Sequence, residues 1–358
     1  MLNSILKLYG FSPDTYTIIP FGNGLINKTW IIAVEQRKFI VQKINTSIFK
    51  SPNLIAQNIN RLNLFFKESF PEYLFVHPIA SLQNEEMIVI PDDGYYRIFP
   101  FIEGSVTFDT VNNPKLAFEA AKQFGKFTHL LSTFDSSKLE ITLPDFHNLK
   151  LRFKQFENAL NNGNKDRIYA CKAVINSIKK YKNIVTIFNT LQTNKHFKKR
   201  VTHNDTKISN VLFNESGKGL CVIDLDTVMP GYFISDVGDM LRTYLSPVSE
   251  EEIDLSKIEV REEFFDAILI GYLSEMENEL SAEEIKHFVY AGIFMIYMQA
   301  LRFLTDHLNN DIYYGAKYEG HNFNRCNNQL ELLKQLLAKE KVLQKKLAIY
   351  LPDSHKDC

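Results

Sequence analysis

The chain has 358 residues, 45% hydrophobic and 23% charged, which is enough for two lobes with their own cores. Its net charge of -1 argues against bulk attraction to nucleic acid or to an anionic membrane. Four cysteines without paired spacing predict neither a zinc site nor a disulfide framework, and we expect a cytoplasmic protein. The N-terminus lacks the pattern of a signal peptide. The longest apolar run, residues 288–304, contains Gln299 and Arg302, so we expect no membrane helix.

The first 100 residues are predicted to form mostly strands. Period-two alternation of apolar residues and turn-forming residues such as Asp92-Asp93-Gly94 support this prediction. A short helix is expected ahead of the strands, and apolar residues at helical spacing predict a longer helix over residues 53–68. The predicted strands span residues 15–20, 28–34, 37–44, 86–90 and 95–99. Together they predict an N-terminal lobe, residues 1–100, made of a five-stranded sheet and one helix.

Residues 101–358 are predicted to form a mainly helical lobe. Ser281 and Glu284 have the spacing of a capping box, which favours a helix start at that point. The predicted helices span residues 114–131, 168–191, 262–276, 281–308 and 331–350. The fold class is therefore α+β, with a strand-rich N-terminal lobe and a helical C-terminal lobe.

The segment around Asp205 carries the strongest functional signal. His203-x-Asp205 is followed five residues later by Asn210, and Asp224 comes fourteen residues after Asn210. Phosphoryl transfer needs such groups, because one carboxylate accepts the proton of the attacking hydroxyl while an amide oxygen and a second carboxylate hold Mg²⁺. Residues 211–213 and 220–223 are short apolar runs around a turn, so a predicted hairpin would fold Asp224 back beside Asn210. A turn asparagine and an aspartate at the end of a strand, both structural, are the alternative.

The amino-acid sequence of this region resembles that of a known family. The residues that carry the resemblance are His203-Asn204-Asp205-Thr206-Lys207-Ile208, Ile223-Asp224-Leu225-Asp226-Thr227-Val228-Met229-Pro230-Gly231 and Asp236-Val237-Gly238-Asp239-Met240-Leu241-Arg242. The chain resembles the aminoglycoside phosphotransferase-like kinases from about Phe21 to about Tyr314, and within them the bacterial N-acetylhexosamine 1-kinases. The resemblance implies a two-lobed protein-kinase-like fold, ATP and Mg²⁺ as cofactors, and a small-molecule sugar acceptor.

The expected nucleotide site begins with a glycine-containing loop between two strands. Glycines let the backbone fold closely over phosphates, although a plain hairpin turn is the alternative here. Lys43 follows one strand later and is expected to pair with the phosphates, unless it is a surface lysine. The expected cofactor-binding residues are Gly22, Asn23, Gly24, Asn27, Thr29 and Lys43, together with Pro100, Phe101 and Ile102 of the segment joining the lobes.

The residue that steadies Lys43 is left open by the sequence. Protein kinases use a glutamate on the next helix, but residues 53–67 contain no acidic residue. Gln57 and Asn58 are polar candidates, and Glu68 comes late in the helix.

The acceptor-side expectations rest on the resemblance. Asp205 is the expected catalytic base, Lys207 is expected to neutralise the transferred phosphoryl group, and His203 to brace the loop. Asn210 and Asp224 are the expected Mg²⁺ ligands. Arg302 and Tyr313 are expected to bind the sugar, although an ion pair between Arg302 and Asp306 at i+4 is the alternative. Asp226 could bind metal or substrate or cap a turn, while Asp236 and Asp239 could anchor the following helix with Arg242; we favour structural roles for these aspartates.

The leading hypothesis is ATP-dependent phosphorylation of the anomeric hydroxyl of GlcNAc or GalNAc. A kinase of an aminoglycoside, choline, another amino alcohol or another hexose keeps the chemistry and changes the acceptor. A non-catalytic nucleotide-binding protein on a kinase fold is a further alternative, disfavoured because Asp205, Asn210, Asp224 and Lys43 are all present. The oligomeric state is left open, with a monomer compatible with the sequence.

Overall fold

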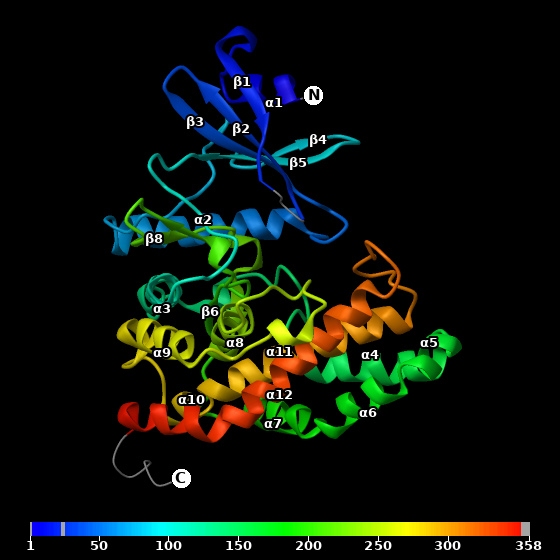
Figure 1. Cartoon of the computed structure of the whole chain (residues 1–358). Helices are drawn as coiled ribbons and strands as arrows, with labels where there is room; N and C mark the ends of the chain where they lie inside the picture. Colours follow the sequence, from blue (N-terminus) through cyan, green and yellow to red (C-terminus); the bar gives the residue numbers. More distant parts are fainter. Residues whose placement is uncertain (1, 23–25, 352–358) are drawn as a thin grey trace. The chain divides into compact units, whose positions relative to one another are not determined.

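The computed structural model describes residues 2–22 and 26–351 (Figure 1). The chain divides into two compact units, each assembled from three segments. Unit 1 comprises residues 1–106, 133–144 and 212–230, and unit 2 comprises residues 107–132, 145–211 and 231–358. The predicted lobes, residues 1–100 and 101–358, are continuous in sequence, whereas residues 133–144 and 212–230 belong to the compact unit that contains the sheet.

Unit 1 contains the predicted five-stranded antiparallel sheet, in the order β1-β2-β3-β5-β4. One of its faces packs against helix α1 (Leu2–Leu8) through Ile5 and Leu6, which meet Ile32, Val41 and Ile98 in an apolar core. The strands are β1 (Tyr16–Pro20), β2 (Lys28–Val34), β3 (Arg37–Lys43), β4 (Ile88–Ile90) and β5 (Gly94–Pro100). The α+β fold class is therefore confirmed, with the sheet in unit 1.

The remaining elements of unit 1 follow the sequence signals closely. Ser51 and Pro52 begin helix α2 (Pro52–Ser69), because proline at the first helical position leaves no hydrogen bond unmade. The predicted hairpin is present as β7 (Val211–Phe213) paired with β8 (Gly219–Val222), and it leads into the 3₁₀ turn η4 (Leu225–Thr227). A second 3₁₀ turn, η2, spans Ser136–Lys138.

Unit 2 is mainly helical and is organised around the buried helix α11 (Phe288–Leu308), which contacts α4, α8 and α12 (Figure 1). Its other helices are α3 (Pro114–Leu130), α4 (Leu149–Asn162), α5 (Lys165–Ala170), α6 (Lys172–Lys180), α7 (Asn183–Thr193), α8 (Phe233–Tyr244), α9 (Glu262–Met276), α10 (Ala282–Lys286) and α12 (His321–Leu347). Unit 2 also contains the short strand β6 (Arg200–Thr202) and the turn η3 (Ile208–Asn210), on either side of the loop of Asp205. The short strand β9 (Met229–Gly231) begins in unit 1 and ends at the first residue of the last segment of unit 2.

Three predicted helices have different bounds in the structure. Residues 168–191 belong to α5, α6 and α7 rather than to one helix, with breaks at Cys171 and at Tyr181–Lys182. Residues 281–308 are split at His287 into α10 and α11. Helix α12 begins at His321 rather than at residue 331. No Gly or Pro lies within three residues of Cys171 or His287, so the local sequence gives no signal for a helix end at either position. The predicted capping box of Ser281 and Glu284 is confirmed.

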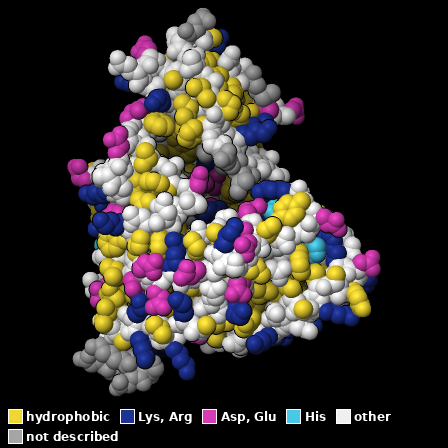
Figure 2. All heavy atoms as spheres, in the orientation of Figure 1, with side chains coloured by type: hydrophobic (Ala, Val, Ile, Leu, Met, Phe, Trp, Pro, Cys, Tyr) yellow, Lys and Arg dark blue, Asp and Glu magenta, His cyan; other side chains and the backbone are white. Residues whose placement is uncertain are grey.

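Helix α11 is long and apolar enough to cross a membrane by length and composition alone. However, 89% of its most apolar window is buried inside the protein, as in the core helix of a globular domain. Figure 2 shows acidic and basic side chains interspersed with hydrophobic ones over the visible face, as expected from the near-zero net charge.

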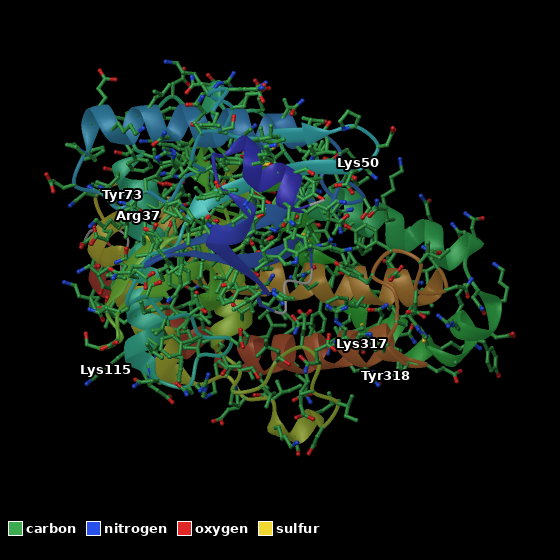
Figure 3. All side chains as sticks on the ribbon, turned by 90° about the horizontal axis from the view of Figure 1, so that it is seen from above. Arg37, Lys50, Tyr73, Lys115, Lys317 and Tyr318 are labelled. Carbon is green, nitrogen blue, oxygen red and sulfur yellow. The ribbon has the colours of Figure 1, made fainter. Side chains whose placement is uncertain are left out.

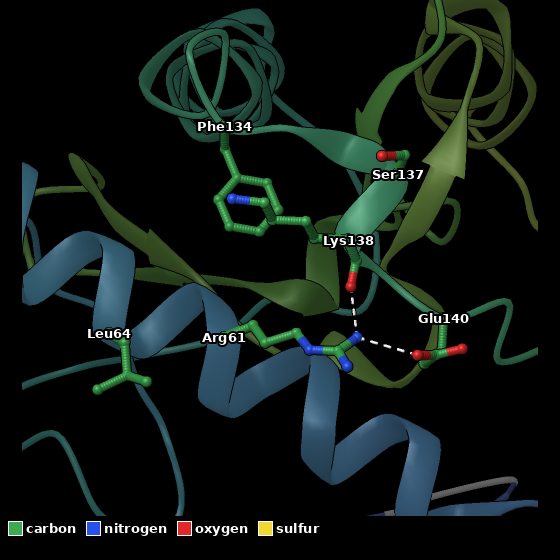
Figure 4. Close-up of a pocket in the computed structure, with 6 residues that line it drawn as sticks. All are labelled: Arg61, Leu64, Phe134, Ser137, Lys138 and Glu140. Carbon is green, nitrogen blue, oxygen red and sulfur yellow. Dashed lines mark hydrogen bonds and ion pairs between the residues drawn. The ribbon is translucent and has the colours of Figure 1, made fainter.

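A surface pocket of about 470 Å³ lies in unit 1, beside α2 and η2. Arg61 donates to the carbonyl of Lys138 and pairs with Glu140 at 3.1 Å across it (Figure 4). None of the residues singled out in the sequence lines this pocket, so it is not the expected active site.

Candidate active site

Three of the predicted site residues meet in one loop of unit 2. The Lys207 ammonium nitrogen lies 2.9 Å from Oδ1 of Asp205, and the amide nitrogen of Asn210 donates to Oδ2 of Asp205 at 3.2 Å and to its carbonyl at 2.8 Å. The oxygen end of the Asn210 amide is thus the end that can bind a cation. The loop therefore presents a carboxylate, an ammonium group and an amide oxygen side by side.

The electrostatics of this loop keep Asp205 ionised. Burial alone favours the protonated carboxyl, but Lys207 and His203 outweigh burial and lower the pKa of Asp205. The charge of Asp205 in turn raises the pKa of Lys207. An ionised carboxylate at neutral pH can orient a hydroxyl group and accept its proton.

Two buried aspartates of α8 hold the loop in place. Asp236 accepts hydrogen bonds from the backbone N–H groups of His203 at 3.0 Å and Asn204 at 2.7 Å, and Asp239 accepts from that of Thr206 at 2.9 Å. Asn204 has a φ of 65°, a left-handed conformation that costs free energy for a non-glycine residue. The two carboxylates thus hold the strained backbone next to Asp205, so they support this loop as well as the helix.

His203 is fully buried. Its ring contacts the rings of Phe124 and Phe127 edge-on, with centroids 5.1 and 6.2 Å away. The backbone N–H of Asp205 donates to Nδ1 of His203 at 3.4 Å. These contacts are those of a bracing residue.

The predicted metal ligand Asp224 lies in unit 1, two residues after the end of β8 and directly before the turn η4, with a left-handed φ of 60°. Two residues later, Asp226 is 1% exposed and pairs with Arg97 at 2.6 Å. The side-chain amide of Asn27 donates to the other oxygen of Asp226 at 2.8 Å. The role of Asp226, which the sequence leaves open, is that of a buried ion-pair partner, and Arg97 is a residue that the sequence interpretation missed.

Lys43 lies on the α1-covered face of the sheet. Residues two apart along a strand share a face, and Val41 belongs to the α1 core, so Lys43 shares that face. There Lys43 pairs with Asp93 at 2.5 Å, so its partner comes from the β4–β5 turn rather than from α2. The opposite face carries Gln42, which accepts hydrogen bonds from Arg97 at 2.8 and 3.1 Å. The phosphate-binding role of Lys43 remains a prediction.

The other expected nucleotide residues also lie in unit 1. Gly22 has a φ of 74°, which favours glycine, while Asn23 and Gly24 lie outside the described residues. Thr29 pairs with Gln42 in the β2–β3 register.

The predicted joining segment continues from the end of β5. Pro100 is the last residue of that strand. The backbone N–H of Phe101 donates to the carbonyl of Lys38 at 3.2 Å, and the carbonyl of Ile102 accepts from the backbone and hydroxyl of Ser105. An adenine-binding role for this segment remains a prediction.

Arg302 and Tyr313 meet in unit 2. The guanidinium group of Arg302 donates to the Tyr313 hydroxyl at 3.4 Å and lies 5.8, 5.3 and 5.9 Å from the ring centres of Tyr313, Tyr314 and Phe146. Asp306 instead accepts from the backbone N–H groups of Tyr313 and Tyr314, at 2.7 and 2.9 Å. The alternative of an Arg302–Asp306 ion pair is therefore wrong, because Asp306 holds the tyrosine segment.

The segment that carries these tyrosines is anchored again nearer α12. There Lys317 pairs with Glu251 at 3.0 Å, and the ring of Tyr318 lies 4.9 Å from that of His321 (Figure 3).

The fold is shared with solved phosphotransferases. An aminoglycoside phosphotransferase from Alicyclobacillus acidocaldarius matches with a TM-score of 0.64 at 11% identity, over 96% of this chain and 95% of that one. A microcompartment-associated aminopropanol kinase matches with a TM-score of 0.64 at 12% identity, over 97% and 98%. Spectinomycin phosphotransferase APH(9)-Ia, solved with ADP and spectinomycin, matches with a TM-score of 0.60 at 15% identity, over 94% and 97%. At these identities the likeness shows the fold.

The family is shown by the sequence itself. Residues 17–279, more than half of the chain, match the model of the phosphotransferase enzyme family, APH. The matched range includes the loop of Asp205 and Asn210 and the hairpin that ends at Asp224. The chain thus belongs to the phosphotransferase enzyme family.

Proposed function

We propose that this small-molecule phosphotransferase transfers the γ-phosphoryl group of ATP to the anomeric hydroxyl of an N-acetylhexosamine, GlcNAc or GalNAc. The observation that carries the proposal is the position of Arg302, framed by Tyr313, Tyr314 and Phe146 in the same unit as Asp205. A guanidinium group donates several hydrogen bonds to sugar oxygens, and aromatic rings offer flat apolar faces to a sugar ring.

In this proposal Asp205 orients the anomeric hydroxyl and accepts its proton. Its lowered pKa keeps it ionised, and the hydroxyl oxygen then attacks the γ-phosphorus in line with the departing ADP oxygen. The ammonium group of Lys207 lies 2.9 Å from the carboxylate of Asp205. Since Asp205 contacts the attacking hydroxyl in this proposal, Lys207 would be near the transferred phosphoryl group and would neutralise its charge. The products are the sugar 1-phosphate and ADP, without a phospho-enzyme.

Asn210 and Asp224 are the proposed Mg²⁺ ligands. Their amide and carboxylate oxygens are the hard donors that this ion prefers, and the amide nitrogen of Asn210 is already engaged by Asp205. When bound, Mg²⁺ would neutralise charge on the nucleotide phosphates. The ligand pair is supported by donor chemistry and by the resemblance of the motifs.

A kinase of cationic acceptors is the second candidate, since structural neighbours include an ethanolamine kinase and a choline kinase. Ammonium acceptors call for carboxylates or aromatic cages. Arg302 places a positive charge among the rings instead. This observation favours an uncharged acceptor.

The test is ADP release with Mg²⁺-ATP across GlcNAc, GalNAc, glucose, galactose, choline and kanamycin. The proposal expects turnover on the N-acetylated sugars and a 1-phosphate product by phosphorus NMR. Turnover confined to choline or kanamycin would overturn the sugar assignment and keep the phosphotransferase.

A further inference from the structure

A second arginine lies near Arg302 and has not been assigned a role. Arg152, on the first turns of α4, donates to the carbonyl of Asp145 at 2.9 Å and to Gln155 at 3.1 Å. The Nε atom of Arg152 is buried without a hydrogen-bond partner among the described residues. Its guanidinium group also donates to the carbonyl of Phe146 at 3.4 Å, and the ring of Phe146 lies 5.9 Å from the guanidinium group of Arg302, so both arginines meet at Phe146.

His147 belongs to this cluster as well. Its ring stacks on that of Phe146, with centres 4.4 Å apart, and Phe146 in turn faces Arg302. Within the described part of the chain, Nδ1 of His147 is buried without a hydrogen-bond partner. Burial and the positive charge of Arg302 lower the pKa of His147 to about 3, so the imidazole is neutral at physiological pH. A neutral imidazole can either donate or accept through this nitrogen.

The charges of the cluster are not balanced by carboxylates. Among the described residues, neither Arg152 nor Arg302 forms an ion pair within 4 Å, whereas Arg242 and Arg325 both pair with Glu250. The fold thus neutralises two arginines of unit 2 and leaves two others with hydrogen bonds to uncharged groups only. Asp145 lies near Arg152, but its carboxylate accepts from Asn148 at 2.7 Å.

Unpaired buried donors identify the chemistry that they recognise. Guanidinium groups only donate, so they match carbonyl and hydroxyl oxygens, and a buried donor left unpaired costs free energy. An ammonium group also only donates, and beside two guanidinium groups it would meet like charge. We infer that Arg152 and His147 extend the acceptor site beyond Arg302 and select acceptors with uncharged oxygen-bearing substituents, such as an N-acyl group, against acceptors that carry an ammonium group. This inference rests on the proposed function and deepens it.

The experiment compares kcat/KM for GlcNAc and for glucosamine, which differ by an acetyl group and a charge, at about pH 6, where an amine is protonated. Wild-type protein is expected to prefer GlcNAc, and Arg152→Gln to reduce that preference by roughly tenfold or more, since one like charge is removed. Arg152→Lys keeps the charge and is expected to retain the rejection of glucosamine. Lys150→Gln, an exposed position on the same helix, is the matched control and is expected to leave the ratio unchanged.

The outcomes separate this inference from the proposed function. Turnover of GlcNAc with the same preference in Arg152→Gln as in wild type would overturn the inference and leave the function standing. If galactose or glucose proves to be the acceptor, the function fails, and the same ratio measured against galactosamine or glucosamine still tests Arg152. Should Arg152→Gln not fold, His147→Gln gives the second test, with a reduced preference expected and an unchanged one contradicting the inference.

Discussion

Arg97 and Asp226 form a fully buried ion pair in unit 1, with 2.6 Å between Nη2 and Oδ1 and each side chain 1% exposed. Gln42 holds the same guanidinium group, and Asn27 holds the same carboxylate. This chain of contacts ties the sheet and the end of the glycine loop to the turn that follows Asp224. The sheet thereby fixes the backbone that presents the proposed metal ligand.

Breaking the buried pair should be costly. Asp226→Asn leaves the charge of Arg97 without its partner, so we expect a loss of about 3–5 kcal/mol in unfolding free energy. The double variant Asp226→Asn/Arg97→Gln should lose less than the sum of the single variants. Glu103→Gln, which breaks the exposed Lys38–Glu103 pair, is the control and should change stability little. Urea unfolding measures the stability of Asp226→Asn, Arg97→Gln, the double variant and the control. Additive effects of the two single variants would contradict the pairing.

Asp205 should be indispensable for turnover and dispensable for nucleotide binding. Asp205→Asn removes the proton acceptor but keeps the size of the side chain, so kcat is expected to fall by about 10²–10⁴-fold. The Kd for ATP, measured by calorimetry, should change only slightly. Retained turnover would sink the assignment of Asp205 as the base.

Stability should depend on pH through Asp236. Burial raises the pKa of Asp236 to about 7, so between about pH 4 and pH 7 the folded state binds a proton that the unfolded state has lost. Its contribution to stability is therefore present at low pH and lost as pH rises, by up to about 1.4 kcal/mol per pH unit. Asp236→Asn removes this titration, so the stability gap between wild type and variant should narrow from pH 4.5 to pH 7.5 in urea unfolding. A gap that widens with pH would mean that the buried carboxyl is ionised.

Arg302 should act on acceptor binding. Arg302→Gln is expected to raise KM for GlcNAc by roughly 10–100-fold, since it removes charged hydrogen bonds to sugar oxygens. Tyr313→Phe keeps the ring and should have a smaller effect. KM for ATP should remain near the wild-type value in both variants; a rise confined to ATP would place Arg302 elsewhere.

Gly238 lets the helix of the bracing aspartates approach the helix of Arg302. A Cβ at this position of α8 would stand 2.4 Å from the carbonyl oxygen of Ala291 in α11. Gly238→Ala should therefore cost about 1–3 kcal/mol despite the better helix propensity of alanine. Chemical unfolding tests this, and a variant as stable as wild type would show that the two helices can separate without penalty.

Features whose contacts join residues close in the sequence could be predicted from the sequence alone. The β7–β8 hairpin and the capping box of Ser281 and Glu284 are examples, because their contacts join near neighbours. The loop of Asp205, Lys207 and Asn210 is equally local, and its contacts follow from the spacing of the motif.

Long-range pairings could not be predicted in this way. Arg97 and Asp226 meet only through the folded unit, so no local pattern marks them. The face of the sheet on which Lys43 lies could, however, be predicted from the sequence. Phe39, Val41 and Lys43 are two residues apart along one strand, so the lysine shares a face with the apolar residues, and Gln42 lies on the opposite face. The break at Cys171 has no local signal either, since neither Gly nor Pro stands near it.

The most direct test of the central claim is phosphorus NMR of the product formed from GlcNAc and Mg²⁺-ATP by wild-type protein, with Asp205→Asn as the blank. The account predicts a sugar 1-phosphate signal that appears with ADP and is absent from the blank. ADP release and phosphate transfer with choline or kanamycin, and none with N-acetylated or other neutral sugars, would contradict it.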